Sequence, residues 1–261
     1  MNPTLSLIVP CHNESEGIAD LAGLLRPVVA EMRGTREVEL VLVDDGSSDD
    51  TGARLRKVFG DDPFWAPVRI ETHATNRGLG AALATGFAVA RGEIICTLDA
   101  DGTYRPAEVP ALVARLEASH ADIASGSPYH REGSVAGVPG WRLALSKSCS
   151  RLYAVLTGTN LSCYTGMFRA YRAGWARPSA ITHPGFLGVT EVLIRALHAG
   201  AQVVEYPVCL HQRQTGVSKM RVLRTLRLHL VFMSGLLLRG LDVNREPSAL
   251  RAPGPANKRP Y

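Results

Sequence analysis

Cysteine is scarce in this sequence, and its cysteines follow no ligand pattern. Five cysteines occur among 261 residues, and none of them forms a Cys-x-x-Cys pair or has the spacing of a zinc site. Several lie in apolar stretches, where a reduced thiol packs as a small apolar side chain. We therefore expect reduced core cysteines in a chain of ordinary globular composition, with 46% hydrophobic and 20% charged residues.

A long hydrophobic run and a leader segment are also missing. The most apolar stretch, Leu228 to Leu238, contains His229 and is shorter than the roughly 20 residues that a membrane-spanning helix needs. Met1 is followed almost directly by a predicted strand, so the sequence shows no signal peptide. We expect an intracellular, cytoplasmic protein.

Acidic residues are absent from one long segment, residues 206–241. The basic residues of this segment are Arg213, Lys219, Arg221, Arg224, Arg227 and Arg239. Such a segment suits partners that carry phosphate, namely nucleic acid, nucleotides or anionic lipid. A solvated basic face without a partner is the alternative.

The end of this segment predicts an amphipathic helix. Arginine recurs every third residue after Lys219, and the adjoining helical face carries Leu223, Leu226, Leu230 and Met233. A basic, apolar helix of this kind lies on an anionic membrane surface instead of crossing it. The alternative is a helix that packs on the core and exposes a basic edge. The tail, residues 242–261, contains four prolines and is predicted to be disordered.

Apolar runs that are typical of buried strands alternate with helical patterns in the first hundred residues. The predicted strands are 5–9, 38–43, 68–72 and 94–98. The first predicted helix follows Asn13 and ends at about residue 33, and two more cover 51–59 and 81–90. This alternation predicts right-handed βαβ units, and hence an α/β fold with a mostly parallel sheet and flanking helices. Asn13 and Glu16 predict a capping box for the first helix, and Pro27 predicts a kink or a break in it.

The pattern becomes less regular beyond residue 126. Glycines precede Trp141, and the predicted elements that follow are helix 143–156, strand 165–171, helix 187–198 and strand 202–209. We divide the chain into a main domain, residues 1–220, the amphipathic helix, residues 221–241, and the tail.

Polar clusters follow three of the predicted strands. They are Pro10-Cys11-His12-Asn13-Glu14, Asp44-Asp45-Gly46-Ser47 and Asp99-Ala100-Asp101. In an open parallel sheet the ligand binds beyond the carboxyl ends of the strands, so the three clusters are expected to meet at one rim.

Asp99 and Asp101 place two like charges at the end of an apolar strand. Each ionised carboxylate is penalised by burial and repelled by its neighbour, so a positive charge is the natural partner. Oxygen ligands at this spacing suit Mg²⁺ or Mn²⁺ that is held jointly by the protein and a diphosphate.

Motifs along residues 5–220 resemble those of family 2 glycosyltransferases with the GT-A nucleotide-sugar fold, of the dolichol-phosphate mannose synthase type. They are Ile8-Val9-Pro10, Asn13-Glu14, Val43-Asp44-Asp45-Gly46-Ser47, Asp49-x-Thr51, Asn76-Arg77-Gly78-Leu79-Gly80, Leu98-Asp99-Ala100-Asp101, Gly126-Ser127-x-Tyr129, Thr165-Gly166-x-Phe168-Arg169, Glu205-x-Pro207-Val208 and Arg213-x-x-Gly216-x-Ser218-Lys219.

The resemblance implies a role for most of these residues. Asp99 and Asp101 would hold the metal ion, with Thr103 at the third ligand position. Arg213 and Lys219 would neutralise the departing diphosphate, as fixed cations do where charge develops. The remaining donor-binding residues would be Pro10, His12, Glu14, Val43, Asp45 and Ala100.

Three positions depart from the family pattern. His12 replaces a tyrosine, which alters the stacking expected on the base. Thr103 replaces a frequent glutamine ligand, so that water is expected to fill that coordination site. Pro128 replaces an arginine expected to bind phosphate, and Arg131 is the nearest substitute.

The acceptor is predicted to be a phosphate. Transfer to a sugar hydroxyl needs a general base, whereas a phosphate oxygen is already anionic. Hydroxyl-using relatives tend to carry an acidic pair and a Gln-x-x-Arg-Trp motif, which this sequence lacks; Glu191 is the single acidic candidate, with a surface or capping role as the alternative. The predicted phosphate-binding residues are Arg131, Lys147, Arg151 and Arg169, of which the last three could equally be helix-surface charges.

Together these features predict an inverting, metal-dependent hexosyltransferase that is peripheral on the cytoplasmic face of the membrane. Its donor would be GDP-mannose, with a UDP-sugar possible, and its acceptor a polyprenyl phosphate, with no nucleic acid partner. One alternative is transfer to a soluble hydroxyl acceptor, and another is a catalytically idle scaffold of a membrane complex. A dinucleotide-binding oxidoreductase is disfavoured because no Gly-x-Gly-x-x-Gly follows the first strand.

Overall fold

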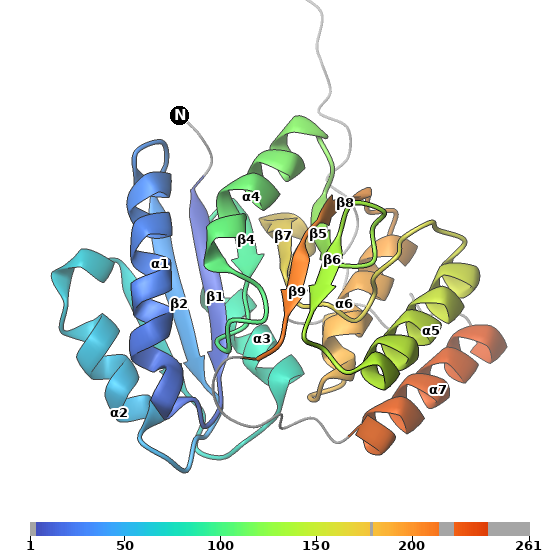
Figure 1. Cartoon of the computed structure of the whole chain (residues 1–261), viewed down its shortest axis with the longest axis horizontal. Helices are drawn as coiled ribbons and strands as arrows, with labels where there is room; N and C mark the ends of the chain where they lie inside the picture. The colour runs from blue at the N-terminus through green and yellow to red at the C-terminus, as the bar shows by residue number, and fades with distance from the viewer. Residues whose placement is uncertain (1–3, 178–179, 214–221, 240–261) are drawn as a thin grey trace, which may run out of the picture.

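The computed structural model describes residues 4–177, 180–213 and 222–239, and its centre is a seven-stranded sheet (Figure 1). The strand order is β3-β2-β1-β4-β7-β5-β8, and β6 and β9 form a separate two-stranded sheet. The strands are β1 (Leu5–Cys11), β2 (Val38–Asp44), β3 (Val68–Thr72), β4 (Ile94–Thr97), β5 (Ile123–Ser127), β6 (Ser134–Ala136), β7 (Arg169–Arg172), β8 (Val203–Pro207) and β9 (Cys209–His211).

The mostly parallel α/β sheet expected from the sequence is confirmed. β1 pairs in parallel with β2 and with β4, and every residue of β1 and β2 is buried. Continuous apolar runs of this kind are typical of parallel strands that are covered on both faces. β7 is the exception, because it runs antiparallel to both β4 and β5.

Helices cover both faces of this sheet. α1 and α4 pack on one apolar core, and α3 and α6 pack on the other, where α5 and α7 join them. The helices are α1 (Ile18–Arg33), α2 (Thr51–Leu55), α3 (Leu79–Val89), α4 (Val109–Ala118), α5 (Gly140–Thr157), α6 (Leu187–His198) and α7 (Val222–Arg239). Figure 1 shows α5 and α7 side by side at one end of the molecule, away from α1 and α2.

Several predicted elements differ from the observed ones. The helix predicted at 51–59 is α2 followed by a π-helical turn, Arg56–Gly60, and the strand predicted at 165–171 is shortened to β7. The strand predicted at 202–209 is divided at Val208 into β8 and β9. The helix predicted from residue 143 already begins at Gly140, three residues earlier.

The capping box predicted for the first helix is wrong. Asn13 has a left-handed backbone, with a φ of 52°, and its Oδ1 accepts a hydrogen bond from the Ser48 backbone N–H at 2.8 Å. The side chain therefore fastens the loop after β1 to the loop after β2 instead of capping a helix. Pro27 lies inside α1, which continues unbroken to Arg33.

Candidate active site

The carboxyl ends of β1, β2 and β4 meet at one cavity of about 340 Å³, which we call the donor cleft. All three polar clusters singled out in the sequence contribute to it. The predicted donor residues that line it are Pro10, His12, Glu14, Asp45, Asp99, Ala100, Asp101 and Arg213. Val43 does not line it, because its side chain is fully buried in the core. The structure therefore does not support a contact between the Val43 side chain and the donor.

Asp99 and Asp101 form the electrostatic centre of the donor cleft. Burial and the neighbouring charge of Asp101 raise the pKa of Asp99 well above its usual value, while Arg213 opposes that rise. Asp101 is held in place by Thr103, whose backbone N–H and hydroxyl donate to its Oδ1 at 3.1 and 2.6 Å. The Thr103 hydroxyl thus orients a carboxylate here.

This carboxylate pair fits a divalent cation. Ionising both carboxylates in a half-buried place is unfavourable without a nearby positive charge. Oxygen donors are also what Mg²⁺ and Mn²⁺ prefer, with water or a diphosphate completing the shell. Within residues 4–177, 180–213 and 222–239, no cluster of three or more His, Cys, Asp or Glu side chains is arranged around a metal position.

Arg213 joins two of the predicted donor residues. Its Nη1 lies 3.2 Å from Asp101 Oδ2, and its Nη2 donates to both carboxylate oxygens of Glu14. The strand before it, β9, is fastened to the loop that carries Asp101, since the His211 N–H donates to the Thr103 carbonyl at 2.9 Å. Lys219, the other predicted cation, lies outside the described residues.

Asp45 shapes the opposite wall of the donor cleft. Its Oδ1 accepts a hydrogen bond from the Arg77 backbone N–H at 2.9 Å and lies 2.6 Å from His73 Nδ1. Its Oδ2 accepts from the Gly78 N–H at 2.7 Å. Gly78 has a φ of +98°, a backbone conformation that glycine adopts without strain. Asp45 therefore fixes the turn that leads into α3.

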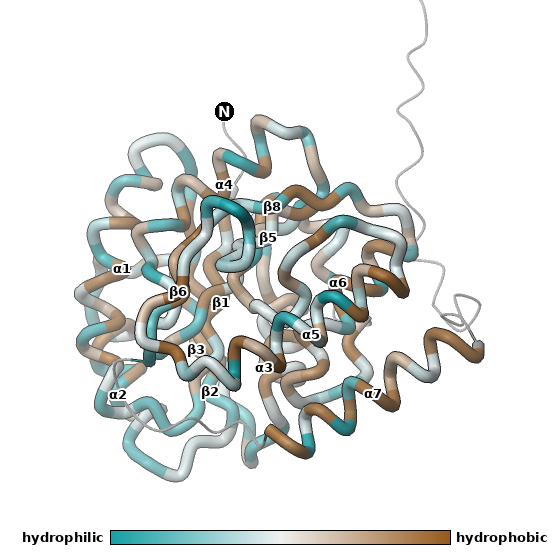
Figure 2. Tube along the Cα trace, turned by 45° about the vertical axis from the view of Figure 1, so that its right-hand side comes forward, coloured by the Kyte–Doolittle hydropathy of each residue, from teal (hydrophilic) through white to brown (hydrophobic). Residues whose placement is uncertain are grey.

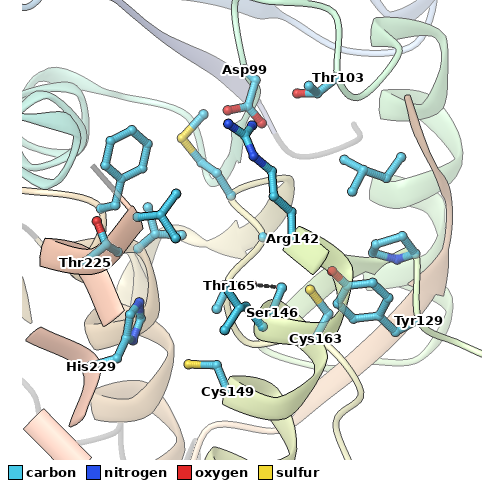
Figure 3. A pocket seen from close by; sticks show the side chains of 18 of the residues that line it. Asp99, Thr103, Tyr129, Arg142, Ser146, Cys149, Cys163, Thr165, Thr225 and His229 are labelled. Carbon is cyan, nitrogen blue, oxygen red and sulfur yellow. Dashed lines mark hydrogen bonds between the residues drawn. The ribbon is translucent and has the colours of Figure 1, made fainter. Parts of the chain in front are cut away.

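A second cavity of about 280 Å³, which we call the acceptor cavity, meets the donor cleft at Asp99. Residues of α5 and α7 form much of its wall, as Figure 3 shows with Cys149 and Ser146 on α5 and with Thr225 and His229 on α7. Apolar side chains dominate its lining, including Leu145, Leu210, Val189, Val222 and Leu226.

Arg142 is a site residue that the sequence analysis missed. It lies on the first turn of α5 and extends toward Asp99 in Figure 3. Its Nε is buried and has no hydrogen-bond partner among the described residues. A buried guanidinium nitrogen without a partner is costly, so the geometry suits an anion at this point. Arg142 could be recognised from the sequence only if the helix is known to begin at Gly140, because Arg142, Ser146 and Cys149 then lie on one helix face.

Arg169 lines neither cavity, so the structure does not support its prediction as an acceptor residue. The side chain is fully buried, and its guanidinium donates to Ser125 Oγ at 3.2 Å and to the carbonyls of Val189 and Tyr164 at 2.7 Å each. These groups hold all three nitrogens within the core. Arg169 therefore fastens β7 to α6 through Val189 and to the loop before β7 through Tyr164.

The other predicted acceptor residues do not converge. Arg131 is exposed, and its Nε lies 3.4 Å from Glu132 Oε1. Arg151 is exposed on α5. Lys147 is also exposed, and its Nζ lies 5.3 Å from the ring centre of Tyr129, which lines the acceptor cavity. Lys147 is therefore the one of these residues that stands near the cavity.

Glu191 is neither a surface residue nor an available base. Its carboxylate is fully buried and accepts hydrogen bonds from the backbone N–H groups of Thr182 and His183 at 2.9 and 2.8 Å. Arg195 Nε donates to it at 3.0 Å. Although burial raises the pKa of Glu191, hydrogen bonds from the side chains of His183 and Thr182 and from the His183 backbone, with the nearby His183 charge, outweigh it and lower the pKa to about 2.

Comparison with known proteins gives the family. The model of the family described as "Glycosyl transferase family 2" matches residues 6–177. The chain is 33% identical to the polyprenol monophosphomannose synthase of Mycolicibacterium smegmatis over 82% of its length and 80% of that protein. It is 31% identical to the undecaprenyl-phosphate mannosyltransferase of Micrococcus luteus, over 82% of its length and 86% of that protein.

A solved structure gives the fold. Glucosyl-3-phosphoglycerate synthase from Mycobacterium tuberculosis, crystallised with Mn²⁺, UDP and glucosyl-3-phosphoglycerate, superposes with a TM-score of 0.65 at 20% identity, covering 90% of this chain and 81% of that one. At this identity the likeness shows the fold, which is the expected GT-A fold. With the family match and the two relatives, it follows that this chain is a glycosyltransferase and belongs to glycosyl transferase family 2.

Proposed function

We propose that this enzyme transfers a hexose, with mannose favoured, from a nucleoside-diphosphate sugar to a polyprenyl phosphate. The observation that carries the proposal is the apolar acceptor cavity that meets the donor cleft at Asp99, with Arg142 at the junction. A polyprenyl phosphate has the same two parts, a charged head and an apolar chain. Relatives named for polyprenyl-phosphate mannose transfer support the same acceptor class.

The donor would bind with its diphosphate at Asp99 and Asp101. A bound Mg²⁺ or Mn²⁺ would supply Lewis-acid stabilisation of the leaving diphosphate at these carboxylates. Arg213 stands within reach of the same place, and its charge would stabilise the diphosphate as the bond to the sugar breaks. Lys219 would add a second cation. GDP is the favoured nucleotide, and UDP is the alternative.

The acceptor phosphate would bind at Arg142 beside Asp99. Its oxygen is anionic at neutral pH, so it can attack the anomeric carbon without a general base. A single displacement of this kind inverts the configuration at that carbon. The buried and fully engaged Glu191 agrees with a reaction in which no carboxylate has to accept a proton.

The test is an acceptor comparison in detergent micelles with Mn²⁺. The wild type would be given radiolabelled GDP-mannose or a UDP-hexose, with undecaprenyl phosphate or with undecaprenol. Labelled product extractable into organic solvent is expected with the phosphate and not with the alcohol, and without metal the rate should fall. Transfer to alcohols, including soluble ones, would contradict the proposal in favour of the hydroxyl alternative. Donor binding without any turnover would favour the scaffold.

We also propose that α7 attaches the enzyme to the anionic, cytoplasmic face of a membrane. One side of α7 packs on the core through His229 and Met233, while its outer side exposes Leu223, Leu230, Val231, Leu237 and Leu238. Figure 2 shows the resulting mixture of hydrophobic and hydrophilic stretches along α7 at the edge of the molecule. Arg224 and Arg227 are exposed on the same helix. None of the helices in the described ranges has the length and hydropathy needed to cross a bilayer.

Vesicle sedimentation tests this attachment. The wild type is expected to sediment with vesicles that contain phosphatidylglycerol, and less so as salt rises, because salt screens the arginine charges. The double variant Arg224→Gln, Arg227→Gln should be released, whereas the matched surface variant Arg91→Gln, Arg105→Gln should not. Equal sedimentation of the two double variants would contradict the role of α7.

A further inference from the structure

The donor cleft and the acceptor cavity share part of their walls. Four of the described residues line both cavities: Leu79, Asp99, Met167 and Phe186. Asp99 is the carboxylate at the proposed metal position, and the other three side chains are apolar. We call Leu79, Met167 and Phe186 the collar, because they line both cavities where the two meet.

The collar residues come from three separate segments of the chain. Leu79 is the first residue of α3, Met167 lies just before β7, and Phe186 immediately precedes α6. Met167 is buried, and its carbonyl accepts a hydrogen bond from Thr97 Oγ1 at 2.5 Å. Phe186 lines both cavities and, at 39% exposed, is far more accessible than the buried Met167.

The loop that carries the collar phenylalanine is held on two sides. On one side the Glu191 carboxylate accepts hydrogen bonds from Thr182 and His183 at 2.5 to 2.9 Å. On the other side the Ala81 N–H, in α3, donates to the carbonyl of Pro184 at 3.0 Å. A loop fastened in this way has little freedom to swing aside and let solvent in.

We infer that the collar makes the enzyme a transferase in place of a donor hydrolase, with Phe186 as its specificity-determining residue and Glu191 as its positioning residue. The inference rests on the proposed function. In transfer, an acceptor oxygen forms the new bond to the anomeric carbon while the carbon–oxygen bond to the diphosphate breaks. Water at the same carbon would give free hexose, with the same diphosphate leaving and a proton released to solvent. An apolar collar excludes that water.

The experiment measures how the donor sugar is partitioned. With donor labelled in the hexose, Mn²⁺ and undecaprenyl phosphate, free hexose and lipid-linked hexose are counted in the same reaction. In Phe186→Ser the ratio of free to lipid-linked hexose is expected to rise several-fold, and in Phe186→Leu, which keeps an apolar side chain, it should stay near the wild-type value. Leu79→Ser provides an independent opening of the facing wall, should Phe186→Ser fail to fold.

Glu191→Gln tests the positioning role, with Glu117→Gln as the matched control, because Glu117 also pairs with an arginine, Arg36, but lines neither cavity. The first variant should raise the ratio and the second should not. A fall in transfer without more free hexose in Phe186→Ser or Leu79→Ser would overturn the inference. A wild type that makes no lipid-linked hexose would instead overturn the proposed function, so the two failures are distinguishable.

Discussion

Replacing Arg213 should make the protein less stable in a way that Mn²⁺ corrects. Arg213 bridges Glu14 and Asp101, and the three side chains are only 18%, 9% and 17% exposed. Without the guanidinium, the two carboxylates and the nearby Asp99 repel one another in a half-buried place. A charge-assisted hydrogen bond contributes about 1.5–3 kcal/mol, so Arg213→Met should lower the free energy of unfolding by about 2 kcal/mol, after a discount for the remaining solvent contact.

A divalent ion can supply the missing positive charge. At the proposed metal position, Arg213 and that ion would compete for Asp101. The variant should therefore bind Mn²⁺ about tenfold more tightly in the absence of nucleotide, a change of about 1.4 kcal/mol. This change is well below the roughly 4 kcal/mol of two unit charges 4 Å apart at an effective dielectric of 20. If the enzyme works as proposed, its turnover should nevertheless fall, because the Arg213 charge would stabilise the leaving diphosphate.

The assay is chemical unfolding with and without Mn²⁺, together with calorimetric titration of Mn²⁺ into the nucleotide-free protein. Arg36→Met is the control, because Arg36 also pairs with a carboxylate, Glu117, at 3.0 Å, but neither residue lines the donor cleft. Mn²⁺ should restore stability to Arg213→Met and not to the control. Equal responses of both variants, or weaker Mn²⁺ binding by Arg213→Met, would refute the reasoning.

Three further predictions follow from single contacts. Arg142→Ala should raise the KM for undecaprenyl phosphate about tenfold or more while leaving the Kd of the nucleotide unchanged, with the exposed Arg151→Ala as control; a change confined to nucleotide binding would contradict this role. Arg169→Met should lower the free energy of unfolding by about 3 kcal/mol, measured by denaturant titration, because it leaves buried carbonyls unpaired. The pKa of Glu191 is lowered from 4.5 to about 2 in the folded state, so its stabilisation is complete above pH 4.5 and is lost as the pH falls toward 2. Wild-type stability should therefore fall more steeply over that range than the stability of Glu191→Gln, and parallel curves would disprove the assignment.

The sequence predicted the donor cleft better than the acceptor cavity. The strands before the cleft are continuous apolar runs, and parallel strands bring their polar ends to one rim, so Glu14, Asp45, Asp99 and Asp101 could be grouped without coordinates. β5 was not predicted, because its sequence Ile-Ala-Ser-Gly-Ser carries only one large apolar residue. In β5 the local sequence pattern does not indicate a strand, although all five residues are buried in the sheet.

The two arginines near the acceptor cavity show why the rest was not predictable. Arg169 follows a phenylalanine in a family motif, and Arg142 follows a tryptophan in a glycine-rich stretch, so both read as basic residues beside an aromatic. What separates them is the direction of the side chain. β7 points Arg169 into the core, where carbonyls satisfy it, and the first turn of α5 aims Arg142 toward Asp99. Arg142 lies on α5 because this helix begins three residues before its predicted start. A difference of this size lies within the usual error of boundary prediction.

On the proposed function, the same geometry selects a phosphate over an alcohol. Arg142 Nε is buried without a partner among the described residues, and an anionic oxygen beside it would satisfy that donor. A neutral alcohol in the same position would leave the guanidinium charge unmatched, and it would also need a base to remove its proton. Glu191, the acidic candidate of the sequence, is occupied by Thr182, His183 and Arg195 and holds its proton only near pH 2. The site therefore discriminates in two ways: it lacks the base that an alcohol needs, and Arg142 provides a charged hydrogen-bond donor for a phosphate.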